Sequence, residues 1–166
     1  MPDSRKGSFQ LFRFAGIGVF LHWSWFFVAV LEISMRGRRN PSLAWNVAEY
    51  LALFLIVTLH EFGHAWVARA VGWKVVGLRW HWYGIAFVAD PDGKPDELWK
   101  VALGGLAATA LLALAFLAGT ALPDPAPLLF RFGFALNAAL LLTNLVPLRQ
   151  LDGGQMLAGL RRVASR

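Results

Sequence analysis

Apolar residues in this chain fall into four long blocks that are separated by short polar gaps. The blocks run from about 16 to 33, 43 to 71, 98 to 122 and 128 to 146. Each approaches or exceeds the roughly 17–25 residues that a membrane-spanning helix needs. Prolines follow the third and fourth blocks, at Pro123 and Pro147, and mark their ends. The pattern predicts an all-α polytopic membrane protein with about four transmembrane helices.

The segment from Trp73 to Asp90 differs from the four blocks. It is too short and too polar to span a membrane as a helix, and it is rich in β-branched and aromatic residues. Gly77 and Gly84 interrupt it, as glycines do at turns and bulges. We therefore expect a short membrane-associated β-hairpin between the second and third spans. The alternative is a plain loop on the lipid headgroups.

Composition supports the membrane assignment. Hydrophobic residues make up 57% of the 166 residues and charged residues 16%, against about 45–50% and about 25% in soluble domains. A soluble helical bundle with a large apolar core is the alternative, but the apolar residues come in blocks of membrane-spanning length. The length predicts a single domain, 1–166. The absence of cysteine excludes disulfides and thiolate metal ligands.

The net charge of +6 comes from basic residues in the gaps between apolar blocks. They form no patch with interleaved aromatic residues, so we expect no nucleic-acid partner. Twelve of the sixteen Lys and Arg residues fall on one side of the predicted topology, which places both termini in the cytoplasm of a multi-pass cell-membrane protein. The Arg36-Gly37-Arg38-Arg39 cluster opposes this orientation locally.

The second block contains the sequence HEFGH, with His60, Glu61 and His64. Residues four apart lie on one face of a helix, so both imidazoles can reach one metal ion. Glu61 lies about 100° away around the helix, where its carboxylate can reach a water molecule on the metal. Ionisable residues inside an apolar helix are functional candidates, because burying them in lipid is costly. The alternative is a helix face that only forms hydrogen bonds within the bundle.

A catalytic zinc ion usually has three protein ligands and an open fourth position. Asp152, which follows the fourth block, is the best candidate for the third ligand. Two neutral imidazoles and one carboxylate leave a net charge near +1, which favours activation of water. Gly153 and Gly154 permit a tight turn that brings the aspartate close to the metal. The sequence thus predicts one Zn²⁺ per chain.

These motifs resemble the site-2 protease family of intramembrane zinc metalloproteases. The resemblance rests on HEFGH in one apolar block and on the pattern N-x-x-P-x-x-x-x-D-G-G about ninety residues later, and it extends over roughly 16–154. It implies zinc ligation by His60, His64 and Asp152, with Glu61 as general base. It also implies that Asn144 binds substrate or stabilises the oxyanion. Because no PDZ or CBS module is recognised, we expect a minimal form of the family.

The chain departs from the family pattern in the third block. Ala108 occupies a position where the family often has asparagine, which removes one polar contact to substrate. Thr109, next to it, is a poor substitute in that role. His22 in the first block either lines the cavity near the zinc or is a buried histidine with satisfied hydrogen bonds. Asn137 is expected to hold helices together.

We therefore expect an intramembrane endopeptidase whose partners are the lipid bilayer and a transmembrane protein substrate. The alternative is a catalytically inactive relative that binds membrane helices or metal as a regulator, and the missing asparagine favours it. The presence of Glu61 favours the enzyme, because a protein that only binds needs no general base. A zinc transporter would need charged residues along a full transmembrane path, which the first and third blocks lack.

Overall fold

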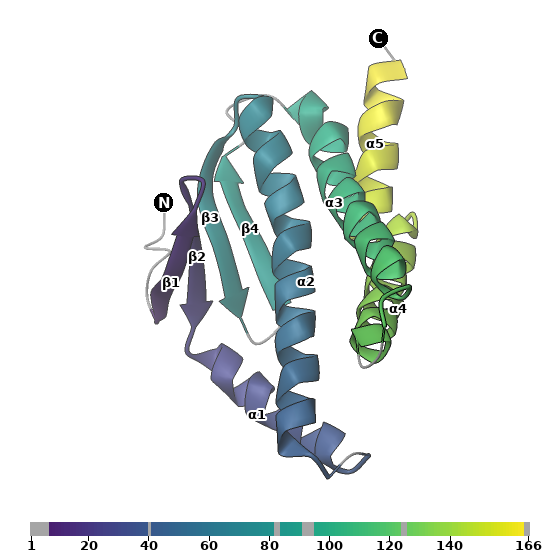
Figure 1. Ribbon diagram of the computed structural model, residues 1–166. Helices are drawn as coiled ribbons and strands as arrows, with labels where there is room; N and C mark the ends of the chain where they lie inside the picture. Colours follow the sequence, from purple (N-terminus) through teal and green to yellow (C-terminus); the bar gives the residue numbers. More distant parts are fainter. Residues whose placement is uncertain (1–6, 40, 82–83, 91–94, 124–125, 165–166) are drawn as a thin grey trace.

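The computed structural model describes residues 7–39, 41–81, 84–90, 95–123 and 126–164. Three layers make up the fold (Figure 1): a β-sheet, the long helix α2, and a group formed by α3, α4 and α5. Helix α2 lies between the other two layers. The elements are β1 (Ser8–Phe14), β2 (Ile17–His22), α1 (Ser24–Gly37), α2 (Leu43–Ala70), β3 (Lys74–His81), β4 (Gly84–Asp90), a 3-10 turn (Pro95–Glu97), α3 (Leu98–Gly119), α4 (Ala126–Leu145) and α5 (Asp152–Ala164).

The sheet has four strands in the order β1-β2-β3-β4. Strands β1 and β2 pair antiparallel, β2 and β3 pair parallel, and β3 and β4 pair antiparallel. The predicted hairpin is therefore present as β3 and β4, but it belongs to a larger sheet. The parallel pair requires a crossover, which α1 and α2 supply. Strands β1 and β4 form the two edges.

The prediction that 16–33 forms one membrane-spanning helix is wrong. Ile17–His22 is a strand, and α1 begins only at Ser24. Ile17, Val19 and Leu21 are buried between the sheet and α2. A strand covered in this way has a nearly continuous apolar sequence, which periodicity alone cannot distinguish from a buried helix.

Two of the described helices, α2 and α3, are long and apolar enough to cross a membrane. In α4 the apolar stretch of the described residues, Phe130–Leu145, is shorter than a typical span. The fold therefore confirms a largely helical chain with membrane-spanning candidates, while the number of spans stays a prediction.

Helix α2 packs on both neighbouring layers through different faces. Phe62 and Ala65 contact the core of the sheet. On another face, a Cβ atom added at Gly63 would lie 2.4 Å from the carbonyl oxygen of Gly104, and one added at Gly104 would lie 2.5 Å from that of Gly63. The backbones of α2 and α3 therefore touch, as expected for small residues at a contact between membrane helices.

The turn between β1 and β2 is joined to the end of α2. Ala15 and Gly16 both have positive φ, 48° and 81°, which is the conformation of a two-residue turn that matches the twist of a hairpin. The guanidinium of Arg69 donates a hydrogen bond to the carbonyl oxygen of Ala15. The N-terminal hairpin is thereby anchored to the last turn of α2.

Candidate metal centre

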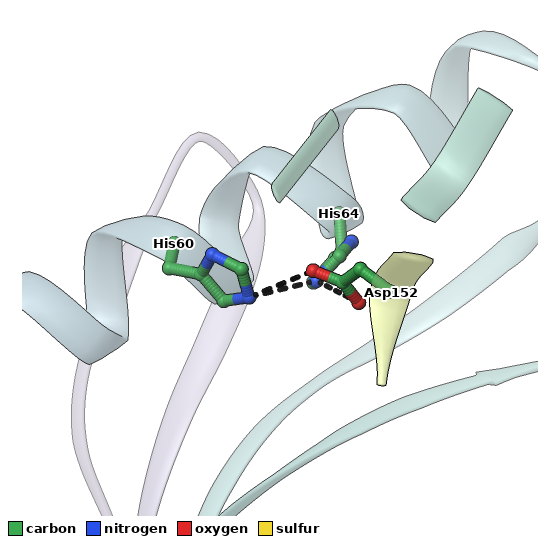
Figure 2. A group of neighbouring side chains, drawn as sticks. All are labelled: His60, His64 and Asp152. Atoms are coloured by element: carbon green, nitrogen blue, oxygen red, sulfur yellow. Dashed lines mark hydrogen bonds and ion pairs between the residues drawn. The ribbon is translucent and has the colours of Figure 1, made fainter. Parts of the chain in front are cut away.

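Three buried side chains meet where α2 and α5 approach each other (Figure 2). His60 and His64 extend from consecutive turns of α2, and Asp152 is the first residue of α5. The Nε2 atoms of the two imidazoles lie 3.1 Å apart. The Asp152 carboxylate places Oδ2 3.2 Å from Nε2 of His60 and Oδ1 3.3 Å from Nε2 of His64. Sequence positions that are almost ninety residues apart thus converge on one point.

The spacing of these donor atoms fits a tetrahedral metal ion. Zinc binds imidazole nitrogen and carboxylate oxygen at about 2.0–2.2 Å, so tetrahedral ligand atoms lie about 3.3–3.6 Å from one another. The three observed separations, 3.1 to 3.3 Å, are close to this range. The donor set also leaves a fourth position open, as catalytic zinc sites do. The residues present therefore fit a zinc ion without large rearrangement.

The hydrogen bonds of the second ring nitrogens prepare both imidazoles for a metal. Nδ1 of His64 lies 2.8 Å from the carbonyl oxygen of Val101, which can only accept, so this nitrogen carries the proton. Nδ1 of His60 lies 2.7 Å from Oγ1 of Thr109. Because this hydroxyl donates to the carbonyl oxygen of Gly105 at 3.1 Å, it accepts from His60. Both Nε2 atoms then present lone pairs to the site.

Helix α3 also provides the space that the imidazoles occupy. A Cβ atom added at Gly105 would lie 2.2 Å from Cε1 and 2.3 Å from Nε2 of His64, and 2.9 Å from Cε1 of His60. These distances are too short for any side chain, so only glycine is compatible with the observed ring positions. Gly105, Val101 and Thr109 are spaced by four residues and share one face of α3.

Asp152 is positioned by the glycines that follow it. A Cβ atom at Gly153 would lie 2.4 Å from the carbonyl oxygen of Leu145, and one at Gly154 would lie 2.0 Å from that of Leu148. The first turn of α5 therefore packs directly on the end of α4 and on the segment that connects the two helices. Burial raises the pKa of Asp152, but in the metal-free site protonated His60 and His64 donate hydrogen bonds and contribute positive charge that outweigh it and lower the pKa to about 2; a bound metal would replace these protons. The carboxylate is thus ionised, as a metal ligand must be.

The other predicted site residues, Glu61, Asn144 and His22, are not members of this group of three. Glu61 is partly buried on α2 and interacts electrostatically with all three members. Asn144 lies near the end of α4, where its Nδ2 donates to the carbonyl oxygen of Leu140 at 3.1 Å. His22 lies at the end of β2, where its Nδ1 is 2.7 Å from Ser24 Oγ and its ring packs against His81. Among the described residues, the group able to hold a metal contains only His60, His64 and Asp152.

Sequence reasoning missed the contribution of α3. Thr109 was considered only as a substrate contact, whereas its hydroxyl orients His60. A signal was present in the sequence. Thr109 is the one polar side chain in the part of α3 that follows Lys100, it lies four positions after Gly105, and the two share a face. In lipid such a hydroxyl needs a partner, and a histidine on the adjacent helix is a suitable one.

Replacing Gly105 by alanine should displace the imidazoles. We expect the Gly105→Ala variant to lose most of its bound zinc, because the new methyl group would overlap His64. Metal content per folded chain, measured by inductively coupled plasma mass spectrometry, tests this. Gly37→Ala is the matched control, because its Cβ would lie 3.9 Å from the nearest atom. Full zinc content in Gly105→Ala would contradict the proposed packing.

Removing the hydroxyl of Thr109 should weaken metal binding while preserving shape. Thr109→Val leaves Nδ1 of His60 without its acceptor, and loss of such partners typically lowers metal affinity about 10- to 100-fold. Thr109→Ser retains the hydroxyl and should restore most of the affinity. Competition with a zinc chelator measures both variants. Equal zinc affinity in the valine and serine variants would show that the hydroxyl does not orient His60.

Comparison with curated proteins finds zinc metalloproteases. The chain is 33% identical over 155 residues to a putative zinc metalloprotease of Synechocystis, covering 86% of this chain and 41% of that protein. It is 30% identical over 156 residues to a zinc metalloprotease of Methanocaldococcus jannaschii, covering 90% and 44%. A segment of 35 residues is 51% identical to the regulator of sigma-E protease RseP of Salmonella typhimurium. The chain spans less than half the length of these curated relatives. No family model matches it.

Solved structures give an independent comparison of the fold. The site-2 protease of Methanocaldococcus jannaschii superposes with a TM-score of 0.67 at 24% identity, over 90% of this chain and 69% of that one. The chain is therefore similar over most of its length to curated zinc metalloproteases, and its fold resembles that of a site-2 protease.

Proposed function

We propose that this chain is a zinc-dependent endopeptidase that cleaves transmembrane segments of membrane proteins. The observation that carries the proposal is the group of His60, His64 and Asp152, with donor atoms 3.1–3.3 Å apart and Glu61 beside them. The two histidines and the glutamate lie in a helix that is long and apolar enough to span a membrane. The family of the relatives supports the same reaction.

Each residue has a defined role in this proposal. His60, His64 and Asp152 hold the zinc ion, which supplies Lewis acidity that acidifies water and polarises a peptide carbonyl. Glu61 accepts the proton of the attacking water and then delivers it to the leaving amide nitrogen. Asn144, near the end of α4, contacts the substrate or the developing oxyanion. Thr109 and Val101 keep the imidazoles in the tautomer that binds metal.

A transmembrane substrate must unwind before its peptide bonds become accessible, because a helix satisfies its own backbone hydrogen bonds. An exposed sheet edge can bind such an unwound segment by adding it as another strand. Strand β4 forms one edge of the sheet. In this proposal the substrate pairs with β4 and extends toward the metal, and both termini of the enzyme face the cytoplasm.

Replacing the general base should separate metal binding from catalysis. We expect Glu61→Gln to retain about one zinc ion per chain and to lose cleavage at least about 100-fold, which is typical for loss of a general base. Asp152→Ala should lose both zinc and activity. The assay uses detergent-purified protein and a single-span test substrate, with cleavage followed by gel electrophoresis and metal content measured in parallel.

The same assay separates the enzyme from an inactive regulator. A parent chain that folds and binds zinc but does not cleave any of a panel of single-span substrates would contradict the proposed protease and favour a binding role. A Glu61→Gln variant as active as the parent would exclude Glu61 as the base.

Proline substitutions in β4 test the strand-addition step. Neighbouring strand residues direct their N–H groups to opposite sides, so Ile85→Pro and Ala86→Pro remove one donor toward β3 and one toward the open edge. We expect the edge-directed variant to keep its thermal stability and to lose about fivefold in kcat/KM, the effect of about one hydrogen bond. The other variant should be less stable. If the edge-directed variant cleaves at the parental rate, β4 does not pair with substrate.

A further inference from the structure

A second cavity lies where the end of α1 and the start of α2 meet α4, apart from the metal centre. Its volume is about 430 Å³, within the range of sites for small ligands. Charged side chains of Glu32, Arg36, Arg39 and Glu49 line one part of it. Phe132 and Leu136 of α4 line another part. The cavity thus joins a charged region to an apolar wall.

The charges in this cavity are unevenly paired. Arg36 forms ion pairs with two carboxylates, those of Glu32 at 3.0 Å and Glu49 at 3.7 Å. Two carboxylates therefore share one guanidinium, which leaves an excess of negative charge. Trp45 donates a further hydrogen bond to Glu49 at 2.6 Å, which holds this carboxylate in place.

Arg39 contributes the opposite charge. Its side chain is exposed, and among the residues that the structure describes its guanidinium forms no ion pair. The wall of the cavity therefore has a region of excess negative charge and, next to it, one positively charged group that a ligand can bind. A ligand with a single charge would satisfy only one of them, and a ligand without charged groups would satisfy neither. A zwitterion of suitable size would satisfy both.

The position of the cavity along α2 indicates the environment of its ligand. Helix α2 is a candidate membrane span that begins at Leu43, with Ser42 as its N-cap. Glu49 and Asn46 lie in its first two turns, and Trp45, a residue type enriched at the membrane–water boundary, lies beside them. Lipid headgroups occupy this level of a bilayer, whereas the apolar wall of α4 extends toward the hydrocarbon.

We propose that this cavity binds a phospholipid whose headgroup carries a primary ammonium group, as phosphatidylethanolamine does. Arg39 binds the phosphate, and the carboxylates of Glu32 and Glu49 accept hydrogen bonds from the ammonium group. The glycerol and the upper acyl chains contact Phe132 and Leu136. Phosphatidylglycerol lacks the ammonium group, and the trimethylammonium of phosphatidylcholine has no N–H to donate, so both should bind more weakly.

Lipid retention by the full chain tests the proposal. The protein is delipidated in a maltoside detergent and exposed to equal amounts of phosphatidylethanolamine, phosphatidylglycerol and phosphatidylcholine with identical acyl chains, and retained lipid is counted by native mass spectrometry. We expect phosphatidylethanolamine to be retained about fivefold over either of the others, the effect of one partly exposed charge contact.

Substitutions test the phosphate-binding and the ammonium-binding parts of the site separately. Arg39→Gln should lower retention of phosphatidylethanolamine about fivefold, whereas Arg38→Gln, the adjacent arginine outside the cavity, should leave it unchanged. Glu32→Gln should remove the preference for phosphatidylethanolamine over phosphatidylglycerol. Thermal unfolding of each variant in detergent shows whether the fold is kept, so that a change in retention can be assigned to the cavity.

Three results would overturn the proposal. Equal retention of the three lipids would show that the cavity does not recognise the headgroup. If Arg38→Gln and Arg39→Gln lowered lipid retention equally, retention would depend on the general surface charge and not on this cavity. Displacement of the lipid by an equal concentration of soluble glycerophosphoethanolamine would make a soluble zwitterion, and not a membrane lipid, the occupant. None of these outcomes depends on zinc content or cleavage.

Discussion

The metal centre depends on contact between the backbones of α2 and α3. Two imidazoles inside an apolar helix each carry a second ring nitrogen that needs a partner, and a bilayer provides no water for it. Here α3 supplies both partners, the carbonyl oxygen of Val101 and the hydroxyl of Thr109. It can do so only because Gly63, Gly104 and Gly105 let the helices approach closely enough. The small residues of α3 are therefore as necessary to the site as the ligands themselves.

Much of the site could be predicted from the sequence, because its chemistry needs particular residue types at fixed spacing. Two histidines four apart in a helix and a distant Asp-Gly-Gly step predicted a group that the structure brings together. The contribution of α3 was not predicted. A hydrogen bond from His60 to Thr109 joins residues 49 positions apart, and no local pattern specifies which turn of another helix faces a given histidine.

The fold was less predictable than the site. The first apolar block was interpreted as a membrane helix because its apolar run is long enough, yet the chain pairs its first half with β1 and β3. The parallel pairing of β2 with β3 brings together segments separated by two helices, and such pairing depends on tertiary contacts. By contrast, the hairpin of β3 and β4 is local, and its aromatic and β-branched residues, interrupted by Gly77 and Gly84, were sufficient to predict it.

The hydrogen bond from Arg69 to the β1–β2 turn makes the sheet and α2 one part of the molecule, distinct from the part formed by α3, α4 and α5. The sheet and α2 are tied together by this hydrogen bond and by their shared apolar core, while α5 packs on α3 and α4. His60 and His64 belong to the first part, and Asp152 belongs to the second. An ion bound by all three residues would therefore also connect the two parts of the molecule. The two parts are also joined directly by the close packing of α2 on α3 at Gly63 and Gly104, so a bound ion would lie beside a backbone contact that already holds its ligands together.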